Sequence, residues 1–284
     1  MPHAIHLTLD PRTAKRPLPS HAIPAIHANF YQWLAEADPA LAKTMDNAEG
    51  AKPFTTSPLY QCNGRCEVRL TILDDSLLDL ITLGLDRRPY AKIYGDQFPI
   101  VRQRMLARSY ADLSQNAGAQ SAVVLCFDTP LSFTSREMDY ILPDPVFAFS
   151  SYIDRWNAFV PHALQVDPAY IEWVRDAVAV SRFDLHSQAL KFKSHQLIGC
   201  TGRIQYRIVK TDKSTPLAVH TFNALASFAE FCGTGRKTTQ GMGQTTRYPQ
   251  WDLPEPIPRP ITRNREDAGS LVMPLWVTHS AANI

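Results

Sequence analysis

The 284-residue chain is predicted to be an α+β protein with two ferredoxin-like domains in tandem. Three observations predict this fold class. Short apolar runs typical of strands alternate with amphipathic helical patterns. The order strand–helix–strand–strand–helix–strand, which defines a ferredoxin-like unit, occurs in the first half, and the second half has it with one additional helix. The hydrophobic content of 45% is that of a globular protein. We expect an N-terminal domain over residues 1–120, a C-terminal domain over residues 121–250 and a Pro-rich tail over residues 251–284.

The first half begins with His3–Leu9, which alternates as a strand does. A helix should start near Pro24, because proline suits the first helical turn. Five apolar residues recur at helical spacing and should form its buried stripe: Ile23, Ile26, Phe30, Trp33 and Leu34. Strand residues follow between Leu59 and Leu73. Ser76 is expected to cap a second helix, and Val101–Arg108 to form the last strand.

The second half should contain the same order of elements with one additional helix. The expected segments are a strand at Ala122–Phe127, helices at Val146–Phe159 and Ala169–Val180, strands at Ser181–Leu185 and Ile198–Val209, and a helix at Thr221–Phe231. A last strand should follow the glycine-rich segment after that helix. The tail from Trp251 to Pro260 is rich in proline and should be extended.

Composition limits the location of the protein and its chemistry. The sequence has no run of some 18 apolar residues and no signal-peptide pattern at its start, so we expect a cytoplasmic protein without a membrane span. The five cysteines are odd in number and lack a second pair at zinc-ribbon spacing. We therefore expect reduced structural thiols, no metal and no cofactor.

Positive charge is concentrated in one part of the chain. The net charge is only +2, but residues 190–247 contain nine Lys or Arg against two acidic residues. This local excess is typical of a surface that binds a polyanion. Lys191 and Lys193, and likewise Arg203 and Arg207, alternate along strands, so each pair should project from one sheet face. These four residues are candidates for RNA binding, and edge charge that prevents aggregation is the alternative.

The segment GTGRKTTQGMG at residues 233–243 contains four of the 12 glycines, Gly233, Gly235, Gly241 and Gly243. Glycine permits positive φ angles and close approach of another molecule. Successive N–H groups beside Arg236 and Lys237 predict a concavity for phosphate. The Walker spacing is absent. The alternative is a helix cap followed by a hairpin turn.

This segment, which follows a helix ending in F-x-x-F-C-G, resembles the C-terminal signature of the CRISPR repeat-processing endoribonucleases of the RAMP superfamily. Three further segments resemble motifs of that family and occur in the family's order: KPFTTSPL at 52–59, LPDP at 142–145 with RWNAF at 155–159, and IGCTG at 198–202. The resemblance spans roughly residues 3–247. In the segment RWNAF, Trp156 should be a core residue, and Arg155 should bridge the domains or reach phosphate.

The resemblance implies tandem ferredoxin-like (RRM-like) domains and binding of CRISPR repeat RNA. It also implies metal-independent cleavage of precursor CRISPR RNA by 2′-OH attack, which leaves a 2′,3′-cyclic phosphate. Such cleavage needs a base, an acid and a cation near the phosphate. The family's catalytic tyrosine and lysine match Tyr31 and Lys52. The family's histidine, six residues before that lysine, matches Asp46.

Three hypotheses follow from this departure. In the first, His27 transfers a proton in the cleavage reaction. It lies four residues before Tyr31 on the same helical face, and a histidine titrates near neutrality. The alternative is that His27 only forms a hydrogen bond to the backbone. In the second, Asp46 is the base, assisted by Tyr31 or Lys52. A carboxylate is a poor proton donor at neutral pH, so this hypothesis predicts slow cleavage. In the third, the protein binds repeat RNA without cutting it.

A function of another class is a structural RAMP subunit of an interference complex. Other subunits of such a complex, or a second copy of the chain, are then possible partners. The combination of K-x-F-T with G-x-G-R-K-T-T-x-G-M-G favours the processing group.

Overall fold

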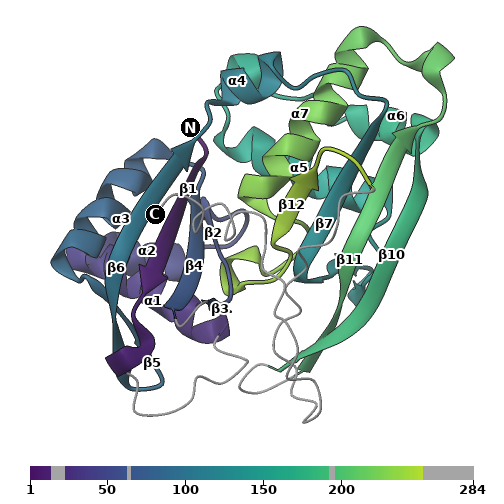
Figure 1. The fold of residues 1–284 in the computed structure, drawn as a ribbon. Coiled ribbons are helices and arrows are strands. Elements are labelled where there is room, and N and C mark those ends of the chain that lie inside the picture. Colours follow the sequence, from purple (N-terminus) through teal and green to yellow (C-terminus); the bar gives the residue numbers. More distant parts are fainter. Residues whose placement is uncertain (14–22, 63–64, 192–195, 252–284) are drawn as a thin grey trace. The chain divides into compact units, whose positions relative to one another are not determined.

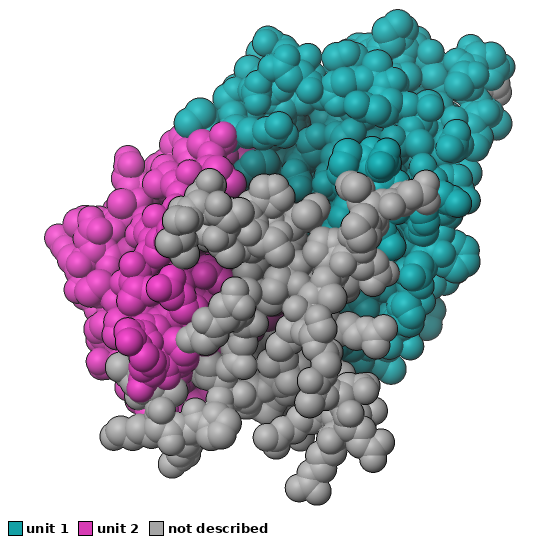
Figure 2. Space-filling view, in the orientation of Figure 1, with its two compact units in different colours: residues 1, 108–238, 242–255 teal, residues 2–107, 239–241, 256–284 magenta. Residues whose placement is uncertain are grey.

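The computed structural model describes residues 1–13, 23–62, 65–191 and 196–251. Among these residues the chain divides into two compact units (Figure 2). The N-terminal unit contains residues 2–107 and also residues 239–241, and the C-terminal unit contains residues 1, 108–238 and 242–251. The domain limits expected from the sequence stay a prediction, and the tail beyond Trp251 lies outside the described residues.

The N-terminal unit has the strand order of a ferredoxin-like domain (Figure 1). Its elements are β1 (His3–Leu9), a 3-10 turn (Pro11–Thr13), α1 (Ile23–Ala37), α2 (Pro39–Asn47), β2 (Phe54–Thr56), β3 (Tyr60–Cys62), β4 (Arg65–Ile72), α3 (Asp75–Arg87), β5 (Tyr90–Ile93) and β6 (Asp96–Ala107). The sheet runs β2-β4-β1-β6-β5, and β3 pairs with β4. All of these pairings are antiparallel.

The core of this unit lies between its sheet and α1. Ile26, Phe30, Trp33 and Leu34 are fully buried, which confirms the predicted helical stripe at these four positions. They pack in one cluster with alternate residues of β1, such as Ile5 and Leu7. Burial of each such side chain contributes roughly 1.5–3 kcal/mol, so this stripe fixes α1 firmly on the sheet.

The C-terminal unit repeats the topology. Its elements are α4 (Tyr110–Gln115), β7 (Ala122–Leu131), β8 (Phe133–Ser135), β9 (Met138–Tyr140), α5 (Pro145–Phe159), α6 (Tyr170–Ala177), β10 (Val178–Lys191), β11 (Gln196–Ile208), α7 (Pro216–Cys232) and β12 (Thr245–Tyr248), with 3-10 turns at His162–Leu164, Thr211–Lys213 and Thr238–Gln240. The sheet runs β10-β11-β7-β12, and β8 and β9 form a separate hairpin. The predicted α+β class with two ferredoxin-like units is confirmed.

Several sequence predictions of local structure are wrong, among them the start of α7 at Pro216 and the end of β7 at Leu131. The N-cap of α3 is Asp74, whose carboxylate accepts from the backbone N–H of Ser76. α6 ends at Ala177, and Val180 belongs to β10, which continues to Lys191. Pairing with β11 along the whole of β10 overrides the helical pattern of that segment. β6 is also longer than expected and begins at Asp96.

The prediction that Trp156 is a core residue is confirmed, because only 1% of its surface is exposed. Cys66, Cys126, Cys200 and Cys232 are free and buried. None of the described helices combines the length and the apolar composition that a membrane span requires.

Candidate active site and glycine-rich loop

His27 and Tyr31 come together on the N-terminal unit. Both lie on α1, one turn apart, and their ring centroids are 5.1 Å apart in an edge-on arrangement. Phe54 of β2 lies next to both rings, at 6.3 Å from His27 and 5.7 Å from Tyr31. His27 and Tyr31 are each partly buried. The helical spacing of the two residues therefore produces one shared surface, as the sequence indicated.

The imidazole of His27 is oriented by a backbone carbonyl. His27 Nδ1 lies 2.7 Å from the carbonyl oxygen of Thr239. The hydroxyl of Thr56 donates to the same oxygen at 2.8 Å. Because a carbonyl only accepts, this hydrogen bond requires the proton to be on Nδ1, and Nε2 is then the accepting nitrogen of the neutral ring. Thr239 belongs to the short segment 239–241 that the glycine-rich loop contributes to this unit.

The phenol of Tyr31 is a proton donor at neutral pH. Burial, and next the negative charge of Asp46, raise the pKa of Tyr31 to about 12. Both causes disfavour the phenolate. Tyr31 is therefore suited to donate a hydrogen bond or a proton, and unsuited to act as a base.

Lys52 and Asp46 lie at the C-terminal end of α2. Asp46 is exposed. The Lys52 ammonium donates to the carbonyl oxygens of Met45, Asp46 and Ala48, at 3.3 Å from that of Asp46 and 2.6 Å from that of Ala48. A cation at this position stabilises the negative end of the helix dipole. The sequence motif indicated the charge of Lys52 but gave no sign of this helix-ending role.

The glycines of the loop are required by close backbone contacts. Gly243 has a φ of +60°, and a Cβ atom there would lie 1.9 Å from the carbonyl oxygen of Thr234. Gly235 has a φ of +77°, and its Cβ would lie 2.4 Å from the carbonyl oxygen of Ser132. Gly233 and Gly241 also have positive φ angles. Any side chain at Gly235 or Gly243 would force the backbone apart.

The expectation of a phosphate concavity made by successive N–H groups is wrong for much of this loop. Five of its N–H groups already donate to carbonyl oxygens: those of Gly233, Thr234, Arg236, Met242 and Gly243. Buried backbone donors need such partners, so the segment folds on itself. Arg155 also donates to the carbonyl oxygens of Gly233 and Gly235. Arg155 therefore holds the loop in shape, a role that its sequence motif did not indicate.

The two basic side chains of the loop differ in their surroundings. Arg236 is partly buried; it donates to the carboxylate of Asp139 and, at 3.1 Å, to the hydroxyl of Thr134. Lys237 has a φ of +55°, which is unusual for a residue other than glycine. Partial burial, and next the charge of Arg236, lower the pKa of Lys237.

The basic residues of β11 share one face of the sheet. Arg203, Gln205 and Arg207 alternate with the buried Ile204 and Tyr206, as predicted. The backbone of Lys191 lies in β10, and Lys193 lies outside the described residues.

A groove of about 690 Å³ lies on this face of the C-terminal unit, and its lining includes Arg182, Gln205, Arg207 and Trp251. The guanidinium groups of Arg182 and Arg203 lie 5.5 and 5.4 Å from the Trp251 ring. Neither Arg182 nor Trp251 was predicted from the sequence to be part of this basic face. Alternation along β10 was the available signal for Arg182.

Comparison with known proteins identifies relatives. The family model described as CRISPR-associated endoribonuclease Cas6 matches residues 125–245. A CRISPR-associated endoribonuclease Cas6 of Streptococcus thermophilus is 20% identical over 143 residues, which cover 50% of this chain and 56% of that protein. The chain thus spans little more than half the length of this curated relative.

Solved structures match over more of the chain. A Cas6 product complex is 25% identical with a TM-score of 0.77, and covers 87% of this chain and 99% of its own. A Cas6 structure from Thermus thermophilus is 26% identical with a TM-score of 0.68, and covers 87% of this chain and 98% of its own. The predicted resemblance to the Cas6-type endoribonucleases of the RAMP superfamily is confirmed. In this Cas6-like chain, the family match covers β7 through the glycine-rich loop, whereas His27, Tyr31, Asp46 and Lys52 lie before it.

Proposed function

We propose that this protein binds CRISPR repeat RNA and cleaves precursor CRISPR RNA within the repeat, without a metal ion. Support comes from the Cas6-like sequence and fold and from the paired His27 and Tyr31 on α1. The observation that carries the proposal is the hydrogen bond between His27 Nδ1 and the Thr239 carbonyl. It sets the tautomer in which Nε2 takes up a proton.

In the proposed reaction the 2′-oxygen of the RNA attacks the adjacent phosphorus, and the bond from phosphorus to the 5′-oxygen breaks. His27 Nε2 takes the proton of the 2′-OH, and the Tyr31 phenol gives its proton to the leaving 5′-oxygen. The products are a 2′,3′-cyclic phosphate and a free 5′-OH. Lys52 supplies positive charge near the phosphate. Burial, and next the negative charge of Asp46, raise the pKa of Tyr31 and keep it protonated.

The RNA backbone is proposed to follow the basic residues of the C-terminal unit. Arg203 and Arg207 on β11 supply phosphate contacts, together with Lys191 and Lys193. Arg236 and Lys237 are proposed to contact phosphate from the glycine-rich loop, where Gly233, Gly235, Gly241 and Gly243 give the backbone its shape. For Arg236, phosphate must compete with the carboxylate of Asp139.

The test replaces His27 with alanine and measures cleavage and binding of repeat RNA separately. Cleavage should fall about 10²- to 10⁴-fold, as expected for loss of a group that transfers a proton, while RNA affinity changes little. His162→Ala is the matched control, because His162 is an exposed histidine of the other unit. Unchanged cleavage by His27→Ala would remove His27 from the mechanism.

A second candidate function is repeat-RNA binding without cleavage. The replacement of the family's histidine by Asp46 and the hydrogen bonds that occupy the Lys52 ammonium favour it. Salt-sensitive binding of the intact repeat, with no product in any condition, would support this function in place of the first. Binding of guide RNA without preference for the repeat would support a structural subunit of an interference complex.

A further inference from the structure

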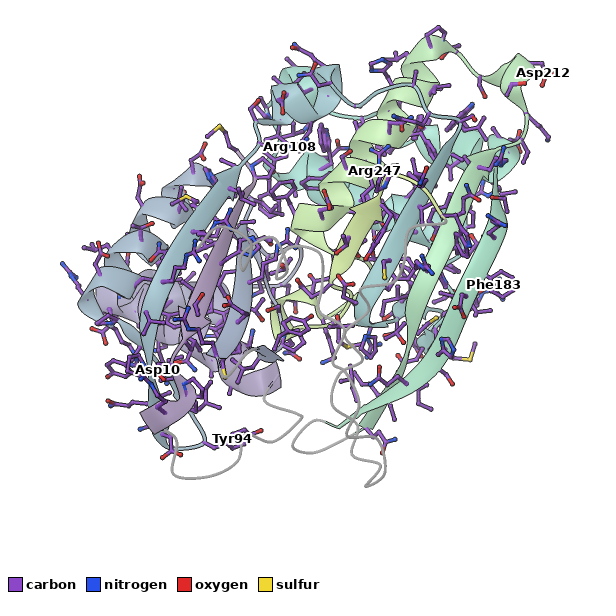
Figure 3. The ribbon with its side chains drawn as sticks, viewed as in Figure 1. Asp10, Tyr94, Arg108, Phe183, Asp212 and Arg247 are labelled. Atoms are coloured by element: carbon purple, nitrogen blue, oxygen red, sulfur yellow. The ribbon has the colours of Figure 1, made fainter. Side chains whose placement is uncertain are left out.

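The C-terminal sheet ends in a long strand that pairs on one side only. β10 covers 14 residues, and within the described chain its sheet partner is β11 alone. An edge strand of this length presents a row of backbone N–H and C=O groups suited to a further strand. Phe183 lies near the middle of β10 (Figure 3). Its side chain is 69% exposed, although its cross-strand neighbour Ile204 is buried.

The charges that flank Phe183 have opposite sign. Arg182 and Asp184 project from the other face of β10, and both are exposed. Charged edge residues ordinarily keep strands from pairing with copies of themselves. In β10, by contrast, the order Arg182, Phe183, Asp184 allows the charges of two copies to attract each other. In an antiparallel pair of identical strands with two-fold symmetry, one residue lies opposite its own copy. When that residue is Phe183, Arg182 of each copy lies opposite Asp184 of the other.

Other registers of the same pair are less favourable. A centre at Arg182 or at Asp184 places two like charges opposite each other, which is destabilising. A centre at Leu185 leaves Arg182 opposite Gln188. Only the register centred on Phe183 forms two cross-strand pairs of opposite full charge at neutral pH, each between Arg182 and Asp184. This register also places the two exposed aromatic rings together.

We infer that β10 is a self-association surface, through which two copies of this chain join their C-terminal sheets in an antiparallel pair centred on Phe183. The ligand of this surface is a second copy of the chain. The inference does not depend on RNA cleavage, because the surface is formed by β10 and the proposed proton-transfer groups lie on α1.

The first test uses charge reversal and sedimentation in the absence of RNA. The unaltered protein should dimerise as its concentration rises. Arg182→Asp and Asp184→Arg should each weaken dimerisation at least 10-fold, since each places like charges opposite one another twice. An equal mixture of the two variants should restore the dimer, because every cross-strand pair is then of opposite sign. Arg175→Asp, at an exposed position of α6, is the control and should dimerise normally.

The second test is cross-linking. Opposite residues of an antiparallel pair have Cβ atoms about 4.5–5.5 Å apart, so Phe183→Cys should form a covalent dimer under mild oxidation, and the unaltered protein should not. A protein that stays monomeric at every concentration would overturn the inference. So would a dimer that survives both single reversals unchanged, or a mixture of the variants that fails to associate.

Discussion

At the scale of single residues, Tyr31 offers a direct test of the proposed proton transfer. Its pKa is raised to about 12 by burial and by Asp46. The phenol therefore keeps its proton through pH 10, where an ordinary tyrosine loses it. Cleavage by the unaltered protein should show no decline between pH 8 and about pH 10. Tyr31→Phe should cut about 10²-fold more slowly or worse while retaining RNA binding.

The pH profile distinguishes this role from a structural one. If Tyr31 only packs against Phe54, the phenylalanine variant should cleave normally, because it keeps the ring. A cleavage rate that already falls near pH 9 would show that an ordinary phenol, or another group, donates the proton.

Position 46 gives a second prediction at this scale. Asp46→His should accelerate cleavage if a histidine there can share the proton transfer, and Asp46→Asn should not. Single-turnover rates on one repeat RNA measure the difference. An unchanged cleavage rate in Asp46→His would indicate that a group other than residue 46, such as His27, carries the proton transfer.

At the scale of elements, the end of α2 depends on Lys52. Removal of its ammonium by Lys52→Met leaves three carbonyl oxygens of the α2 end without this donor and should lower the free energy of unfolding by about 1 kcal/mol. Urea denaturation measures this loss. If Lys52 also stabilises the developing charge on the phosphate, cleavage should fall far more than the lost stability explains. A loss of stability with normal cleavage would restrict Lys52 to the helix end.

The glycine-rich loop gives a prediction about shape. Gly243→Ala should destabilise the C-terminal unit by about 2 kcal/mol or more, because its Cβ meets the Thr234 carbonyl in addition to the strained φ. Gly50→Ala is the matched control, since Gly50 also has a positive φ but its Cβ would meet nothing within 4 Å. Thermal unfolding compares the two. Equal effects would show that φ alone requires glycine in the loop.

The sequence predicted these elements unevenly, for physical reasons. The buried stripe of α1 was visible because its spacing is local. The length of β10 was not, because it depends on pairing with β11, and the contact of His27 with Thr239 joins residues 212 positions apart. Motif resemblance pointed to Tyr31 and Lys52 as candidates. It did not reveal that Lys52 donates to the carbonyl oxygens at the end of α2, or that Arg155 donates to those of the glycine-rich loop.

At the scale of the whole molecule, RNA affinity should depend on basic residues rather than on the modest net charge. Affinity should fall steeply with salt, since phosphate contacts release counterions. Arg207→Gln should lower the slope of log affinity against log salt by about 0.7–0.9. Arg175→Gln, whose guanidinium pairs with Glu172, is the control and should leave the slope unchanged. A slope unaffected by Arg207→Gln would place the RNA elsewhere.

We propose that this Cas6-like protein cleaves repeat RNA with its own proton-transfer groups. The most direct measurement incubates the purified protein with end-labelled repeat RNA in excess EDTA and identifies the product ends. We expect one cut within the repeat that leaves a 2′,3′-cyclic phosphate and a 5′-OH. Intact RNA that is nevertheless bound, or a product formed only when metal is restored, would contradict it.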